Sequence, residues 1–280
     1  MGARGTFRFG NMANRKKKKK LSFGSIVVRI FQIVCLGIFI FSAWQLFGII
    51  SEYRAGEKEY EGLQQYVQFI QRDQPDTDQK ISHPDALAAE ALAVSPVTVD
   101  FLNLRKVNED IVGWIYAEAV PEISYPVVQG EDNEYYLYHT VEKKKNTAAS
   151  IFLDYAGSPD FSDAFTVVYG HNMKNKSMFG RLKSYREQEI YDQSPYLWIL
   201  TPEADYRYEI FSVCTVSAND KVYDLSFMQG EESKGYLERL QQKSEVKNTV
   251  TLTENEPVLM LSTCTGNDST RCVVLAVRAE

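Results

Sequence analysis

The sequence predicts a mainly β fold, a closed or nearly closed barrel with helices on its rim, preceded by one membrane-spanning helix. Three observations support this prediction: an uncharged apolar run before residue 51, a series of short β-rich runs after residue 100, and a few helical segments between those runs. Short strands separated by turn residues are typical of barrels. The chain has 280 residues and 44% hydrophobic content, enough for one packed domain plus appendages.

The first fifty residues are basic and contain the apolar run. They hold nine Lys or Arg and no acidic residue, so the other 22 basic and all 37 acidic residues give residues 51–280 a formal charge of -15. Residues 30–50 carry no charge, and as a helix they would span about 31 Å, the thickness of a bilayer core. The charges on either side predict a cytoplasmic N-terminus and an exported body.

We therefore expect a basic cytoplasmic tail over residues 1–25 and a transmembrane anchor over residues 26–50. A cleaved signal peptide is the alternative, but the apolar run is longer than is usual for one and no small-x-small cleavage site follows it. The basic run lies beside the apolar run instead of on a folded face, which argues against nucleic acid as a partner.

Residues 51–99 are expected to form a helical stalk and a linker. Apolar residues at three- and four-residue intervals predict an amphipathic helix over residues 52–72 (Tyr60, Leu63, Val67, Ile70). Three prolines predict a linker over residues 74–99. The folded domain is then residues 100–280.

The elements of that domain follow from periodicity and turn signals. Helices are expected at residues 101–107, 133–138, 178–186 and 230–242. Strands are expected at residues 111–116, 123–128, 150–153, 165–169, 197–200, 206–216, 257–263 and 272–277.

Cysteine usage indicates an exported protein that does not depend on disulfides. Cys35 lies in the anchor, which leaves Cys214, Cys264 and Cys272 outside, an odd number that cannot all pair. Cys214 and Cys272 lie in apolar runs and are expected to be packing residues. Cysteine and histidine spacings typical of zinc sites are absent from the sequence, so neither a metal nor another cofactor is expected.

Cys264 is a candidate nucleophile because of its position and its neighbour. It ends an apolar run before a six-residue loop, and Arg271 starts the next strand. A hairpin would bring the two residues together at one end of adjacent strands, about 4.8 Å apart. A cation there favours thiolate and can hydrogen-bond an oxyanion. The residues alone leave open that Cys264 is a packing residue and Arg271 a solvated charge.

A cysteine nucleophile needs a proton donor or acceptor, and the exported part contains three histidines. His83 precedes a proline in the linker and is discounted. His171 follows an apolar strand and a glycine, which places it at a barrel rim, whereas His139 ends a helix. His171 is the preferred partner and His139 the alternative.

Four separated motifs resemble those of sortases. Leu-Ser-Thr-Cys at 261–264, with Arg271 and Val-Val at 273–274, resembles the nucleophile and arginine strands of that family. The other three motifs resemble class B sortases in particular. They are Tyr-Gly-His-Asn-Met at 169–173 with Ser-Met-Phe at 177–179, Asn-Glu-Asp-Ile-Val-Gly-Trp-Ile at 108–115, and Asp-Asn at 132–133 with Tyr-Leu at 136–137. The resemblance covers about residues 98–278.

The resemblance implies an eight-stranded closed β-barrel with peripheral helices and a cysteine transpeptidase activity. Cys264 would attack the carbonyl of a threonine in the C-terminal sorting motif of a secreted protein, giving a thioester. His171 would transfer protons, and Arg271 would hold the substrate and its oxyanion. Ser262, Asn133 and Leu137 would line the substrate groove, by the same resemblance.

The family's partners would be secreted proteins with a sorting motif and an amine acceptor, either a peptidoglycan precursor of a Gram-positive cell wall or a pilin lysine. Gly266 and Asn267 stand where some relatives have an acidic residue, so no carboxylate partner is assigned to His171. Two other classes stay open: a cysteine hydrolase that only cleaves, and an anchored β-rich surface protein without enzymatic activity.

Overall fold

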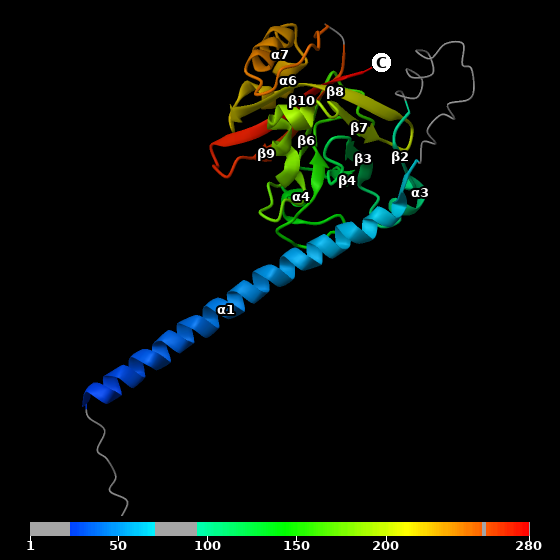
Figure 1. The fold of residues 1–280 in the computed structure, drawn as a ribbon. Coiled ribbons are helices and arrows are strands. Elements are labelled where there is room, and N and C mark those ends of the chain that lie inside the picture. The colour runs from blue at the N-terminus through cyan, green and yellow to red at the C-terminus, as the bar shows by residue number, and fades with distance from the viewer. Residues whose placement is uncertain (1–22, 71–93, 254–255, 280) are drawn as a thin grey trace, which may run out of the picture. The chain divides into compact units, whose positions relative to one another are not determined.

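The computed structural model describes residues 23–70, 94–253 and 256–279. The chain divides into two compact units, Met1–Ile50 and Ser51–Glu280. The second unit is built around a closed β-barrel, labelled in Figure 1. His83 and most of the expected linker lie outside the described residues.

Eight strands close the barrel in the order β10-β8-β7-β3-β4-β5-β6-β9. Their bounds are Ile111–Ala117 (β3), Ser124–Val128 (β4), Ile151–Leu153 (β5), Phe165–Tyr169 (β6), Tyr196–Leu200 (β7), Asp205–Ser217 (β8), Val258–Cys264 (β9) and Thr270–Arg278 (β10). The pairs β4–β5 and β6–β9 are parallel and the other pairs antiparallel. The predicted closed eight-stranded barrel is confirmed, and all eight expected strands form.

The helices around the barrel are short. They are α3 (Phe101–Leu104), α4 (Tyr135–Tyr138), α5 (Gln188–Tyr191), α6 (Leu225–Met228) and α7 (Ser233–Gln242), with 3-10 helices η2 (Phe179–Arg186) and η3 (Lys221–Tyr223). The helix expected at residues 178–186 is therefore of the tighter 3-10 type. The helix expected at residues 230–242 begins three residues later, at Ser233.

Strand β9 is buried on both faces, which explains why its sequence is a continuous apolar run. Leu259 and Leu261 belong to the cluster of the barrel interior. Val258 and Met260 point the opposite way, because successive side chains of a strand alternate. They belong to a second cluster that also contains Leu237 of α7. The strand that ends in Cys264 is thus packed from both sides.

The helix α1 (Phe23–Leu63) begins in the first unit and ends in the second. Among the described residues it is the helix long and apolar enough to cross a membrane. An N-terminal anchor and a signal sequence would both give this finding.

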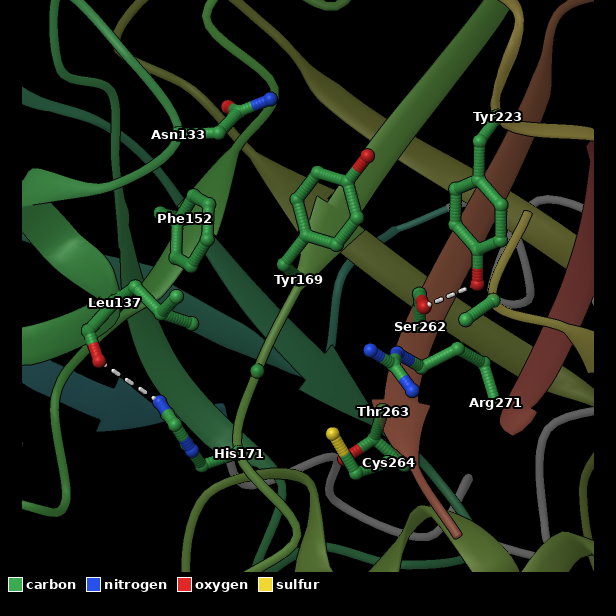
Figure 2. Close-up of a pocket in the computed structure, with 12 residues that line it drawn as sticks. Asn133, Leu137, Phe152, Tyr169, His171, Tyr223, Ser262, Thr263, Cys264 and Arg271 are labelled. Carbon is green, nitrogen blue, oxygen red and sulfur yellow. Dashed lines mark hydrogen bonds between the residues drawn. The ribbon is translucent and has the colours of Figure 1, made fainter. Parts of the chain in front are cut away.

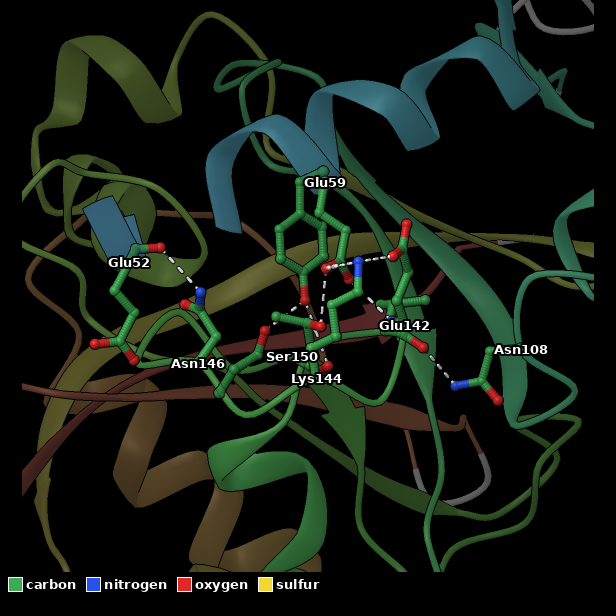
Figure 3. Close-up of polar contacts among 11 residues, drawn as sticks. Glu52, Glu59, Asn108, Glu142, Lys144, Asn146 and Ser150 are labelled. Carbon is green, nitrogen blue, oxygen red and sulfur yellow. Dashed lines mark hydrogen bonds and ion pairs between the residues drawn. The ribbon is translucent and has the colours of Figure 1, made fainter. Parts of the chain in front are cut away.

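The end of α1 packs on the barrel unit. Tyr60 and Leu63 are buried, and the Tyr60 hydroxyl donates to the carbonyl oxygen of Ala149. The Glu59 carboxylate accepts hydrogen bonds from the Thr140 hydroxyl at 3.0 Å and from the Glu142 amide at 2.9 Å (Figure 3). This part of the helix therefore belongs to the folded unit.

One helix over residues 52–72 was expected, and this prediction is wrong beyond Leu63. A 3-10 turn, η1 (Gln64–Tyr66), leads into strand β1 (Val67–Phe69), which pairs antiparallel with β2 (Val97–Val99). The Phe69 ring packs edge-on against Tyr116, with 5.9 Å between centroids. Strand pairing and this aromatic contact outweigh the helical period.

Candidate active site

Three adjacent strands carry the predicted catalytic residues to one end of the barrel. Cys264 ends β9, and Arg271 is its direct partner on the antiparallel strand β10. On the other side β9 pairs in parallel with β6, with Tyr169 opposite Ser262. His171 lies two residues beyond Tyr169, and Cys264 lies two residues beyond Ser262. The side chains of His171 and Cys264 are therefore expected at neighbouring positions on the rim, and both line one pocket.

His171 is held by backbone contacts on two sides. Its Nε2 lies 2.9 Å from the Leu137 carbonyl oxygen. A carbonyl only accepts, so Nε2 carries a hydrogen. The His171 carbonyl accepts from the Phe179 amide at 3.0 Å. The ring is therefore oriented by a backbone carbonyl (Figure 2), and Nδ1 has no partner among the described residues.

Gly170, which precedes His171, lies where neighbouring side chains leave no room for a Cβ atom. A Cβ at this position would lie 2.4 Å from Ile151 Cδ1 and 2.6 Å from Phe179 Cδ2. These distances are far below van der Waals contact. A glycine is therefore required where β6 meets the rim.

The Arg271 guanidinium is fixed at one end and free at the other. Its Nη1 donates to the carbonyl oxygens of Asp268 at 2.8 Å and Thr270 at 3.0 Å. The remaining N–H groups have no bonds among the described residues. Figure 2 shows the guanidinium reaching into the pocket beside Cys264, where it can donate to an anionic oxygen.

A pocket of about 360 Å³ surrounds these residues. All six residues named from the sequence line it, together with six others. The full lining is Asn133, Leu137, Phe152, Tyr169, Gly170, His171, Ala218, Tyr223, Ser262, Thr263, Cys264 and Arg271. Aromatic and aliphatic side chains form most of its walls (Figure 2).

The wall next to Arg271 is formed by Tyr223 and Ser262. Their hydroxyl groups are hydrogen-bonded at 2.7 Å. Burial raises the pKa of Tyr223 to about 12, although the bond to Ser262 and the charge of Arg271 act in the opposite direction. Tyr223 is therefore a neutral phenol at physiological pH.

The opposite wall is organised by the buried carboxylate of Asp154. Its Oδ2 accepts from Asn133 Nδ2 at 2.9 Å and from the Tyr169 hydroxyl at 3.0 Å. The Asn133 side-chain oxygen accepts from the Tyr155 amide at 3.0 Å. Burial, and then the charge of Asp154, raise the pKa of Tyr169. The Asn133 amide is thus bonded to the protein through both its oxygen and its nitrogen.

The other histidine and cysteine candidates lie elsewhere. His139 stacks on Tyr135, with 4.2 Å between ring centroids, and its Nδ1 lies 2.7 Å from the Tyr135 carbonyl oxygen. Cys214 and Cys272 are buried, and burial raises the pKa of both thiols. Neither His139 nor these cysteines line the pocket.

Sequence reasoning missed the aromatic wall made by Phe152, Tyr169 and Tyr223. Tyr169 could have been found, because it ends the expected strand two residues before His171, and alternation continued past the strand end would put both side chains on one face. Tyr223 comes from the short turn η3 between β8 and α6, where no pattern indicates its direction. Within the described parts of the chain, His, Cys, Asp and Glu side chains form no group of three that could hold a metal ion.

Comparisons with known proteins show the family to which this chain belongs. The family model "Sortase domain" matches residues 116–279. "Sortase B" of Listeria monocytogenes is 30% identical over 232 residues, which cover 83% of this chain and 87% of the relative.

Two solved structures are also similar. A sortase B–substrate complex from Staphylococcus aureus has a TM-score of 0.65 and 26% identity, covering 82% of this chain and 99% of that one. A class B sortase from Streptococcus pyogenes, described as involved in pilus biogenesis, has a TM-score of 0.59 and 27% identity, covering 65% of this chain and 98% of that one.

Proposed function

This chain belongs to the sortase family and is a cysteine transpeptidase of class B, and on that premise we propose that Cys264, His171 and Arg271 are its catalytic residues. The observation that carries the proposal is the strand register: β9, which ends at Cys264, pairs on one side with β6, whose last residue Tyr169 lies two positions before His171, and on the other with β10, where Arg271 is the direct partner of Cys264. The three side chains then line one pocket.

In the first half-reaction the Cys264 thiolate attacks the carbonyl carbon of a threonine in the sorting motif. The free N–H groups of Arg271 stabilise the oxyanion. As the peptide bond breaks, His171 donates a proton to the leaving amine, which departs and leaves a thioester on Cys264.

In the second half-reaction an amine attacks the thioester carbonyl. The new C–N bond forms, the C–S bond breaks with its electron pair on sulfur, and the amine proton passes to His171. The acceptor in this proposal is a peptidoglycan precursor. The similarity to a sortase involved in pilus biogenesis supports a pilin lysine as a second candidate.

Ser262, Asn133 and Leu137 line the pocket in which the sorting motif would bind. Leu137 supplies an apolar surface, and its carbonyl orients His171. Ser262 and Asn133 each fix one wall of the pocket. Ser262 does so through its hydrogen bond to Tyr223, and Asn133 through its hydrogen bond to Asp154.

For the N-terminal part we propose a cytoplasmic tail over residues 1–25, an uncleaved anchor over residues 26–50 and an extracellular catalytic domain. The apolar helix α1 and the basic residues before it support this topology. Protease added to intact cells should remove the catalytic domain, and survival of that domain until the cells are lysed would contradict the topology.

The decisive experiment uses the full chain in a nonionic detergent with fluorogenic peptides of the NPxTx and LPxTG types, with and without an added amine. The wild type should form a mass-resolved thioester and an amine-linked product. Cys264→Ala should form neither, and Cys214→Ala, which alters a buried thiol outside the pocket, should form both.

A wild type that forms the thioester but transfers it only to water would favour a hydrolase. A folded wild type without a thioester on any motif would remove Cys264 from the mechanism and favour a non-enzymatic role.

A further inference from the structure

A second cavity adjoins the active-site pocket. Its volume is about 480 Å³, and its walls come from residues 172–187, which follow β6, and from Thr265 and Gly266, which follow β9. Four of the lining side chains are basic, and we call the cavity the basic groove (Lys174, Lys176, Arg181, Lys183).

The basic groove and the active-site pocket share the two catalytic segments. His171 and Cys264 line the pocket, and the residues that directly follow them, Asn172 and Thr265, line the groove. Consecutive Cα atoms are about 3.8 Å apart. The groove therefore begins one residue beyond His171 and Cys264.

The charge of the groove is opposite to that of its surroundings. Residues 51–280 have a formal charge of -15, yet the lining of the groove holds four cations and one acidic side chain, Glu187. Lys176 and Arg181 also border a neighbouring cavity that contains three glutamates (Glu57, Glu61, Glu122). Arg181 is paired with Glu122 at 3.3 Å, whereas the ammonium groups of the lysines bind no carboxylate among the described residues. Lys183 is also half-buried. Unpaired cations that converge on a cavity favour an anionic ligand.

The backbone that carries the lysines is rigid relative to His171. The Lys176 amide donates to the Met173 carbonyl at 2.9 Å, and the Phe179 amide donates to the His171 carbonyl at 3.0 Å. A Cβ on Gly180 would lie 2.7 Å from the Met173 carbonyl oxygen, so this close approach requires glycine. The backbone positions that carry the lysines are thus fixed relative to His171.

We propose that the basic groove binds an anionic group, a phosphate or a carboxylate, carried by the acceptor two or three residue lengths from its attacking amine. This inference rests on the proposed transpeptidase function. An extended segment of that length spans about 7–10 Å, which would let the amine reach the thioester while the anion lies among the lysines. The sorting motif fills the other pocket, so both substrates bind at once.

Three peptides with the same free amine test the proposal: Gly-Gly-Ser-amide, Gly-Gly-phosphoserine-amide and Gly-Gly-Glu-amide. For the full chain in nonionic detergent, the ratio of amine transfer to hydrolysis is measured against peptide concentration. This ratio is taken after thioester formation, so it is independent of donor binding. The phosphorylated or the acidic peptide should reach half-maximal transfer at about tenfold lower concentration than the neutral peptide, and 0.5 M NaCl should remove the difference.

The variant Lys174→Gln/Lys176→Gln/Lys183→Gln should lose this preference for the anion. The matched control removes three exposed lysines elsewhere, Lys58→Gln/Lys106→Gln/Lys243→Gln, and should keep it. Comparison of the two anionic peptides shows whether the groove takes phosphate or carboxylate. Equal transfer to all three peptides, or equal loss in both triple variants, would overturn the proposal.

A binding measurement tests the basic groove independently of the transpeptidase reaction. Fluorescence anisotropy of the same peptides, labelled at the C-terminus, is measured on Cys264→Ala with and without the three lysine changes. Lysine-dependent preference for an anionic peptide supports the groove even if the wild type forms no thioester, in which case the proposed function alone fails. Absence of that preference refutes the groove even if transfer proceeds.

Discussion

Arg271 differs from a simple positive charge because its guanidinium is anchored through one nitrogen and free through the others. A lysine at this position would keep the charge but lose the planar fork of donors. Arg271→Lys should therefore lower kcat by about 10²-fold or more. The check is the rate of thioester formation with a fluorogenic donor peptide, with Arg239→Lys on α7 as the control. Full activity of Arg271→Lys would exclude a directional role.

The Tyr223–Ser262 bond is a second test at the scale of residues. Ser262 is 2% exposed, and the Tyr223 hydroxyl is its bonding partner among the described side chains. Tyr223→Phe should lower the free energy of unfolding by about 1–2 kcal/mol, because a buried hydroxyl loses its partner.

Adding Ser262→Ala to Tyr223→Phe should recover part of this loss. Urea denaturation of the two single variants, the double variant and the wild type gives the coupling energy, expected near 1 kcal/mol. Strict additivity of the two changes would show that the bond has no net effect on stability.

Sequence alone could identify residues whose place follows from strand order. Cys264 and Arg271 were placed together by a hairpin, and the observed register pairs them directly. The orientation of His171 toward the Leu137 carbonyl could not be predicted, because that contact joins segments 34 positions apart that neither strand nor turn patterns connect.

Among the elements, α1 differs most from expectation, since its final turns are part of the folded unit. Tyr60→Ala should lower the free energy of unfolding by about 3 kcal/mol, because a buried aromatic ring and its hydrogen bond are lost. The denaturation midpoint of the full chain in detergent measures this effect. Lys58→Ala, on an exposed position of the same helix, should change the value by less than about 0.5 kcal/mol. Equal, small effects of both changes would show that the helix is only a stalk.

The failure of the helical prediction after Leu63 has a local cause. Val67 and Ile70 satisfy a helical period with Tyr60 and Leu63, but Val67 and Phe69 also alternate with the polar Gln68, as strand residues do. The partner that decides between the two, β2 at Val97–Val99, lies thirty residues later. The strands of the barrel were easier to predict, since their apolar runs are long and bounded by turns.

For the whole molecule, buried tyrosines predict a loss of stability in alkaline solution. Burial is the largest cause of a raised pKa for many of them (Tyr116, Tyr125, Tyr136, Tyr169, Tyr185, Tyr191, Tyr208, Tyr223, Tyr236). An unfolded chain releases these protons near pH 10, and the folded chain does so at higher pH. This stability is thus complete below pH 10 and is lost as the pH rises above it.

Between pH 10 and its own raised pKa in the folded chain, each such tyrosine should lower the free energy of unfolding by at most about 1.4 kcal/mol per pH unit. The measurement is thermal unfolding by circular dichroism between pH 8 and 11, together with tyrosinate absorbance. Absorbance should rise in step with unfolding. Complete titration near pH 10 in a chain that stays folded would contradict the burial of these rings.

The parallel pairing of β6 with β9 also has a consequence for the time course of folding. Tyr169 and Ser262 are partners although 93 positions separate them in the chain. Joining such distant segments is slow, because loop closure precedes any gain from contact. In the proposed mechanism, Cys264 therefore acquires His171 as its proton-transfer partner only when the barrel closes. A nascent or partly folded molecule would lack this pairing, so closure of the barrel would also be the step that makes the chain active.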